Sequence, residues 1–310
     1  MMIPTMLDIQ SMLVMQVLLL CLMVVGVVTV KAGIVDERSR SSMSELVLCV
    51  FLPCNILASF FGTQRSQLPS LGIMLAISVG ILGLSFVLSQ VLFRRAGTEQ
   101  KKVLVYAMLI SNASFLGIPV VESVYGAAGL PYVAVYLMPL RVALWTVGLA
   151  IFTGGKGGLR TVFLHPCMIA TYAGLIVMLT DFTPPALVLR LVSGLGNCTT
   201  ALSMMVVGNI LAQVDPKKLM TPLAAYFTVV RLVLVPLVVM GILLLFRPDP
   251  VISGVSVILS GMPAGATTSL LADKYGADRE LASRIVFAST LLSIVTAPAM
   301  VWLLQYSFVR

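Results

Sequence analysis

Two arginines lie deep inside long apolar stretches of the sequence, and their position suggests chemistry with an anion. Arg141 lies about ten residues from either end of the stretch 130–152, and Arg231 is similarly central in 220–246. On insertion scales, a charge at such a depth in a membrane costs about 2.5–3.5 kcal/mol. Because a guanidinium holds a carboxylate through two parallel hydrogen bonds, an organic anion would compensate this cost.

A structural role is the alternative for both arginines. Each could bond to backbone carbonyls at a helix end, or pair with Glu122 after folding. Acidic partners are few, since Glu122 lies near the outer end of 103–125 and Glu45 near the start of 43–62. Two deep cations without a matching carboxylate favour an anion that arrives from outside the chain.

Polar and helix-weakening residues interrupt the apolar stretch 103–125 near its centre. The sequence SNASFLGIPV at 111–120 brings five such residues together. They are Ser111, Asn112, Ser114, Gly117 and Pro119. Proline removes a backbone donor and clashes with the preceding turn, and glycine lets the chain leave helical geometry. In lipid, the freed amides and carbonyls are costly unless protein, an ion or water satisfies them.

A second interruption occurs in the stretch 251–273, with the sequence SGMPAGATTSLL at 260–271. Its glycine, proline and threonine residues are Gly261, Pro263, Gly265, Thr267 and Thr268. The N-terminus of a half-helix suits an anion, and its carbonyl end suits a cation. We predict that the two interruptions form one substrate site near the bilayer midplane. The alternative is a pair of simple proline kinks with close glycine packing.

Neutral side-chain oxygens are the remaining candidates for ion chemistry, because no Asp lies deep in any apolar stretch. A sodium/proton antiporter needs midplane carboxylates that alternate between a proton and sodium. The candidates for sodium coupling in this chain are Asn55, Asn112, Asn197, Thr199 and Thr200. Asn55, which follows Pro53, is also a candidate for substrate binding. The alternative for Asn55 and Asn197 is hydrogen bonding between helices.

Motifs for enzymatic chemistry are absent from the sequence. It contains no Walker A loop, no GxSxG and no His-Glu zinc motif, and the lone His165 favours a structural role. The cysteines lie in apolar stretches at no metal-like spacing. They are Cys21, Cys49, Cys54, Cys167 and Cys198. We therefore expect neither an enzyme, nor a bound metal, nor a cofactor.

The composition requires a membrane around the chain. Of its 310 residues, 59% are hydrophobic and only 10% are charged, and the mean hydropathy is +1.06. No soluble domain buries so much apolar surface, so we predict an all-α polytopic membrane protein. Ten stretches are long enough to cross a bilayer. They are 9–30, 43–62, 69–93, 103–125, 130–152, 161–180, 187–212, 220–246, 251–273 and 280–306.

The distribution of Lys and Arg predicts the orientation. Fourteen of them lie in connections that follow odd-numbered stretches, and four lie on the opposite side. The positive-inside rule then places the odd connections in the cytoplasm and both termini outside it, with the protein in the inner (plasma) membrane. The net charge of +8 therefore reflects topology rather than binding to nucleic acid.

The two halves of the chain match in their spacing. A shift of 150 residues superimposes the first five stretches on the last five, with Tyr125-Gly126-Ala127 falling on Tyr275-Gly276-Ala277. Since five is odd, the second half must be inverted, and inverted repeats are typical of secondary transporters. We predict two halves, 1–155 and 156–310, within one membrane unit. The alternative is that membrane helices look alike by chance.

Two long motifs carry a family resemblance. The sequence NASFLGIPVVESVYGAAG resembles the fourth helix of the auxin efflux carrier family in its bacterial branch, where an Asn precedes a Phe-Leu-Gly-x-Pro element. The sequence GMPAGATTSLLADKYGADRELASRIVFASTLLSIVTAP is similar to the ninth and tenth helices of the family. LPCN at 52–55 and RLVLVPL at 231–237 also fit, so the resemblance covers nearly the whole chain.

The resemblance implies the ten-helix fold of bile-acid/sodium symporters and sodium/proton antiporters. In that fold, broken helices four and nine cross, and a transport domain moves against a scaffold. Asn112 and Pro119 match the first crossing element, Pro263 matches the second, and Arg231 falls where the fold has its scaffold. The chain departs from the family at His165, where relatives often have Asn, and at Arg141, where a neutral polar residue is expected.

The resemblance also implies transport of organic anions, which are small carboxylates in bacteria and auxin in plants. We predict a secondary transporter for a malate-like, malonate-like or auxin-like carboxylate that works by alternating access. The alternatives are a sodium-coupled symporter of the bile-acid type, a cation/proton antiporter and a channel. The expected partners are the organic anion, the lipid bilayer and, if transport is coupled, a sodium ion or proton. The sequence leaves open whether the chain forms a homodimer.

Overall fold

The computed structural model describes residues 9–61, 67–153, 164, 166–180, 182–212 and 221–308. Within this part of the chain, all regular secondary structure is helical apart from one isolated antiparallel bridge between Ser111 and Ala264. The all-α prediction therefore holds for the described residues. His165 and the predicted boundary at 155/156 lie outside them.

Helices lie in all ten predicted stretches. In chain order they are α1 (Ile9–Lys31), α2 (Glu37–Leu46), η1 (Val47–Phe51), α3 (Leu52–Ser59), α4 (Leu68–Leu92), α5 (Thr98–Leu109), η3 (Ala113–Gly117), α6 (Ile118–Tyr125), η4 (Gly126–Gly129), α7 (Leu130–Ala143), η5 (Leu144–Gly148), α8 (Leu149–Thr153), α10 (Pro166–Thr180), α11 (Ala186–Leu211), α12 (Pro222–Val229), η7 (Val230–Leu234), α13 (Val235–Phe246), α14 (Pro250–Ser260), α15 (Thr267–Lys274) and α16 (Arg279–Phe308). The fourth and ninth stretches are each divided into two helical parts, as the sequence predicts.

Six helical runs among the described residues are long and apolar enough to cross a membrane. They are Glu37–Ala58, Leu68–Leu92, Leu130–Thr153, Ala186–Val206, Pro222–Phe246 and Arg279–Leu304. Shorter apolar helices occupy the other four predicted stretches. They are Leu20–Lys31, Ala113–Tyr125, Pro166–Thr180 and Pro250–Ser260. The chain is a multi-pass membrane protein, and the inverted repeat of ten helices stays a prediction.

Three of the π-helical segments end two residues before a proline. They are η1 before Pro53, η3 before Pro119 and η7 before Pro236. A proline ring clashes with the carbonyl four residues earlier, and a wider turn relieves that clash. In η7, for example, the Val235 N–H donates to the Val230 carbonyl, five residues back. π-Helical turns often occur at functional sites. The segments η3 and η7 are therefore candidates for parts of a functional site.

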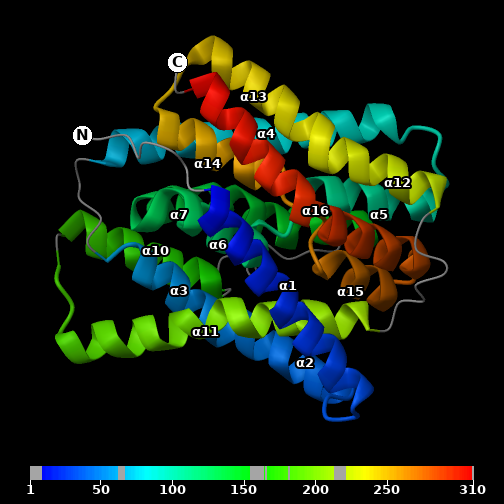
Figure 1. The fold of residues 1–310 in the computed structure, drawn as a ribbon, viewed down its shortest axis with the longest axis horizontal. Helices are drawn as coiled ribbons and strands as arrows, with labels where there is room; N and C mark the ends of the chain where they lie inside the picture. The colour runs from blue at the N-terminus through cyan, green and yellow to red at the C-terminus, as the bar shows by residue number, and fades with distance from the viewer. Residues whose placement is uncertain are drawn as a thin grey trace.

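The helices form two groups. The first helix group consists of α1, α2, α3, α10 and α11. The second helix group consists of α4, α5, α12, α13, α14, α15 and α16. In Figure 1, α2, α3, α10 and α11 fill the lower half, whereas α4, α12, α13 and α14 fill the upper half. α7 lies between the groups, because it packs mainly on α4 and also contacts α3 and α10.

Helices α1 and α11 of the first group approach each other backbone to backbone. A side chain added at Gly26 would collide with the Met205 carbonyl, and one added at Gly208 would collide with the Met23 carbonyl. Small residues allow such close approach between membrane helices, where lipid supplies no hydrophobic driving force. The reciprocal glycine contact therefore holds the first group together as a unit.

The interrupted helices form the centre of the second group. All residues from Val103 to Leu109 in α5, and all from Ile252 to Ser260 in α14, are buried. A helix that is buried on every side has protein neighbours all around it. By contrast, α1, α4 and α11 expose many large apolar side chains, as expected of helices that face lipid. The two interruptions are therefore shielded from lipid by other helices.

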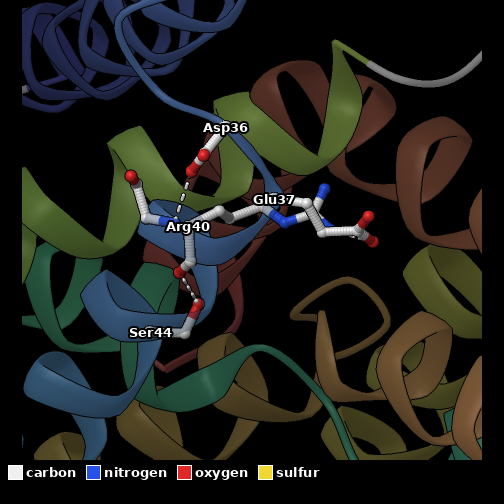
Figure 2. Close-up of polar contacts among 5 residues, drawn as sticks. Asp36, Glu37, Arg40 and Ser44 are labelled. Atoms are coloured by element: carbon white, nitrogen blue, oxygen red, sulfur yellow. Dashed lines mark hydrogen bonds and ion pairs between the residues drawn. The ribbon is translucent and has the colours of Figure 1, made fainter.

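The start of α2 is a polar helix end at the edge of the apolar region. Asp36 is its N-cap, and one carboxylate oxygen accepts a hydrogen bond of 2.7 Å from the Ser39 N–H. Figure 2 shows Arg40 beside Glu37, with which it forms an ion pair at 3.3 Å, and Ser44 bonded to the Arg40 carbonyl. The bond from Ser39 lowers the pKa of the Asp36 carboxyl below its usual value.

Candidate functional site

The two interruptions meet in space, although about 150 residues of sequence separate them. Ser111 lies opposite Ala264 in an antiparallel bridge. The two backbone hydrogen bonds run from the Asn112 N–H to the Pro263 carbonyl, at 2.7 Å, and from the Gly265 N–H to the Ile110 carbonyl, at 3.0 Å. Each interrupted helix thus forms hydrogen bonds with backbone groups that the interruption of the other helix leaves without an intrahelical partner. Lipid could not supply these hydrogen bonds.

Neighbouring helices satisfy further backbone groups at this crossing. The Ala264 N–H donates to the Ser289 hydroxyl of α16 at 3.1 Å. The Tyr106 hydroxyl of α5 donates to the Thr267 hydroxyl at 2.8 Å, which ties the start of α15 to α5. Both contacts hold the interruption at residues 261–266 in a fixed conformation.

Glycine residues let the crossing segments come close. A Cβ added at Gly117 would run into the Leu259 side chain of α14, and one at Gly265 would lie 3.1 Å from the Ile110 carbonyl oxygen. Such distances are tighter than ordinary van der Waals contact, so a larger residue would push the segments apart. The close glycine packing considered from the sequence is therefore present here, together with the paired interruptions.

Arg231 of η7 lies against both interrupted helices. Its Nε donates to the Met262 carbonyl at 3.0 Å, and one terminal guanidinium nitrogen donates to the Met108 carbonyl at 3.1 Å. In an unbroken helix, the Met108 carbonyl would accept from the Asn112 N–H, which instead binds Pro263. Arg231 thus takes the structural role considered from the sequence, as a donor to backbone carbonyls at helix ends.

Arg141 of α7 has no such partners. Only 7% of the residue is exposed, yet none of its three guanidinium nitrogens has a hydrogen-bond partner among the described residues. The alternative of a pair with Glu122 is not seen, and Glu122 is exposed. Three ion pairs in the described part of the chain join neighbours on one helix. They are Arg40–Glu37, Lys102–Glu99 and Arg284–Glu280. A buried, unpaired guanidinium is therefore open to an anion.

The position of Arg141 lies at the boundary between the helix groups. The helix α7 contacts α3 and α10 of the first group. The helix that carries Arg141 also packs on α14 and η3 beside the crossing. An anion bound to Arg141 would therefore contact elements of both groups.

Hydroxyl groups near the crossing are buried without partners. Ser111 Oγ and Thr268 Oγ1 have no hydrogen bond among the described residues. Asn112 is 4% exposed, and Gly117 and Pro119 are also buried, whereas Ser114 is half-buried. Of the sequence candidates, the interruptions thus bring together Asn112, Ser111, Pro263, Gly265, Thr267 and Thr268. Hydroxyl groups without partners at such a place can donate to a carboxylate.

The candidates for ion coupling are less closely placed. The Asn55 amide donates to the Gly196 carbonyl at 3.5 Å, which is the interhelical bond considered as its alternative role. Asn197 is exposed, and the Thr200 carbonyl accepts from Ser203 within α11. Thr199 is buried with an unpartnered hydroxyl. Among the described residues, no hydrogen bond connects these four candidates to the crossing.

Sequence reasoning missed three of the residues that build the crossing. The Ser289 hydroxyl accepts from the Ala264 N–H, the Tyr106 hydroxyl donates to the Thr267 hydroxyl, and the Met108 carbonyl accepts from Arg231. Tyr106 and Ser289 are polar residues in apolar stretches, and this signal could have selected them. No sequence signal identifies a particular backbone carbonyl, because every residue carries one.

Comparisons with known proteins agree with this architecture. A family model described as "Membrane transport protein" matches residues 11–161 and 156–301. An "uncharacterized transporter" of Methanothermobacter thermautotrophicus is 27% identical over 90% of this chain and 94% of its own length. Another, of Methanocaldococcus jannaschii, is 24% identical over 93% of this chain and 97% of its own length.

A third relative carries a substrate in its name. It is a "putative malonate transporter" of Rhizobium meliloti, 27% identical over 47% of this chain and 46% of its own length. These relatives are transporters and not enzymes, as expected from the sequence. Because the family model covers nearly the whole chain, the protein belongs to the membrane transport protein family, that of the auxin efflux carriers which its motifs resemble.

Proposed function

We propose that this membrane transporter is a secondary carrier that moves a small organic anion by alternating access. The observation that carries the proposal is the buried Arg141 guanidinium, which has no partner within the described part of the chain. A carboxylate would supply two parallel hydrogen bonds and the missing negative charge. The name of the Rhizobium meliloti relative, "putative malonate transporter", supports a small carboxylate as the substrate.

The crossing of the interrupted helices would complete the site. Ser111 and Thr268 have free hydroxyl groups there, and the buried Asn112 has a side-chain amide that can donate. A small carboxylate held by Arg141 would reach these groups at the crossing, where Ser111 and Asn112 precede η3 and Thr268 lies in α15. We infer that Asn112 orients the substrate and that the free hydroxyls distinguish it from other anions.

The two helix groups suggest how access alternates. An anion at Arg141 would lie on α7, which contacts α3 and α10 of the first group and α4 and α14 of the second group. Movement of one group against the other would open that boundary to each side of the membrane in turn. We place both termini outside the cytoplasm of an inner membrane, on the basis of the charge distribution.

Cation exchange is less well supported by the same residues. The segments 103–119 and 252–269 around the crossing contain no Asp or Glu, so no carboxylate there can alternate between a proton and sodium. A sodium-coupled symporter would depend on neutral oxygens, and among the described residues no hydrogen bond connects Asn55 or Thr200 to the crossing. We therefore rank anion transport above both alternatives.

Uptake by purified protein in liposomes tests the proposal. Labelled malonate, malate and monocarboxylates would be offered with and without sodium and pH gradients. We expect saturable uptake of at least one carboxylate and a loss of at least about 100-fold in Arg141→Gln, because a charged partner is removed. Arg190→Gln is the matched control, since Arg190 is exposed. Background uptake of every organic anion, with cations transported instead, would refute the proposal.

A further inference from the structure

Arg231 occupies a position that the proposed anion site does not use. It is 3% exposed, and both of its hydrogen bonds go to backbone carbonyls, of Met108 and Met262. These carbonyls lie where the first half of each interrupted helix ends, in α5 and after α14. Two carbonyl ends therefore converge on one guanidinium.

Converging carbonyl ends are a place for a cation. In transporters with broken helices, unwound carbonyls and the C-terminal ends of half-helices coordinate sodium ions or protons. Here the guanidinium donates to such oxygens at 3.0 and 3.1 Å, within the normal range for hydrogen bonds. A sodium ion at these two oxygens would therefore have to displace the guanidinium of Arg231, which is part of the chain itself.

The half-helix ends at the crossing carry opposite partial charges. The C-terminal ends of α5 and α14 each carry about −0.5 of an elementary charge, and the N-terminal ends of η3 and α15 each carry about +0.5. Arg231 donates to carbonyls at the two negative ends, so its positive charge compensates them. Arg141, in contrast, has no hydrogen-bond partner among the described residues.

We propose that Arg231 is the resident cation of the crossing and that it replaces a coupling ion there. The inference rests on the proposed function, because it states how anion transport is coupled: the anion moves without a sodium ion bound to these carbonyls. Arg231 is a positioning residue, since it acts through the backbone of the two interrupted helices and does not touch the substrate.

Thermal unfolding of the purified protein tests Arg231 without any transport assay. We expect sodium to leave the unfolding midpoint of the wild type unchanged relative to potassium or choline. Arg231→Ala should unfold at a lower temperature, and guanidinium ions at low millimolar concentration should raise its midpoint but not that of Arg190→Ala. Arg231→Lys, which keeps the charge, should retain most of the wild-type midpoint. A sodium-dependent midpoint in the wild type would overturn the inference.

Transport measurements then separate this inference from the proposed function. We expect wild-type anion uptake to be equal in sodium and choline media. Arg231→Ala should lose at least about tenfold in rate, because two charge-assisted hydrogen bonds are lost, and guanidinium should restore part of it. Uptake that requires sodium would overturn the role of Arg231 while leaving anion transport intact. If no anion is transported, the proposed function fails, and the unfolding measurements still test the role of Arg231 independently.

Discussion

The two buried arginines differ in what surrounds them. Arg231 donates to two carbonyls at the crossing of the interrupted helices, whereas the three guanidinium nitrogens of Arg141 have no partner among the described residues. Both side chains are equally remote from solvent, so burial alone does not separate them. The difference teaches that a deep charge is structural where the fold supplies its partners and functional where it does not.

Removal of Arg231 should have the largest effect on stability. In Arg231→Met, the carbonyls of Met108 and Met262 lose their donors in the centre of the protein. We expect a loss of about 2–4 kcal/mol, because a buried acceptor left without a donor costs about 1–3 kcal/mol. Thermal unfolding in detergent measures it. An unchanged unfolding midpoint would show that the two hydrogen bonds do not contribute to stability. Arg231 would then not differ from Arg141 in its structural role.

Removal of Arg141 should act in the opposite direction. In Arg141→Met, an unpaired buried charge becomes an apolar side chain of similar length, so we expect a gain of about 1–3 kcal/mol in the absence of substrate. The same variant should lose anion transport. Thermal unfolding and liposome uptake measure the two effects side by side, with Arg190→Met as the control. A clear loss of stability would mean that Arg141 has a structural partner.

A larger residue at Gly265 should separate the crossing segments. In Gly265→Val, the new side chain meets the Ile110 carbonyl oxygen, which lies 3.1 Å from the Cβ position. We expect a cost of about 1–2 kcal/mol from overpacking, and slower transport. Gly72→Val on α4 is the control, because no atom lies within 4 Å of its Cβ position. Equal effects at both sites would argue against a tight crossing.

The smallest effect should come from Asp36, far from both arginines. Its hydrogen bond from Ser39 lowers the pKa of the carboxyl in the folded state. The stabilising contribution is therefore complete above the unfolded pKa and is lost as the pH falls through the folded-state pKa. Between about pH 5 and pH 3, the wild type should lose slightly more stability than Asp36→Asn.

A set of unfolding curves over this pH range measures the difference. Glu45→Gln is a suitable control, since Glu45 is an exposed carboxylate on the same helix. Identical pH profiles for the wild type and Asp36→Asn would show that the charged N-cap of α2 does not contribute to stability.

The interruptions were predictable from sequence because proline and glycine act on their own local backbone. Pro119 and Pro263 therefore marked where the helices break, and the matching spacing suggested that the breaks meet. The distinction between Arg141 and Arg231 was not predictable. It depends on contacts between Arg231 and carbonyls 31 and 123 residues away, and such contacts leave no local pattern.

The ion-coupling candidates show the same limit. A polar side chain in an apolar stretch signals a partner, but not which one. Asn55 finds a carbonyl on α11, and Asn197 is exposed, although both looked alike in the sequence. Side-chain direction around a helix decides such cases, and in lipid it follows from packing with neighbouring helices.

Equilibrium binding of labelled malonate and malate to purified protein tests the central claim most directly. We expect saturable binding to the wild type and to Arg190→Gln, and no measurable binding to an Arg141→Gln variant whose unfolding curve shows that it is folded. Equal affinity in Arg141→Gln and the wild type would contradict the claim that this unpaired guanidinium holds the anion.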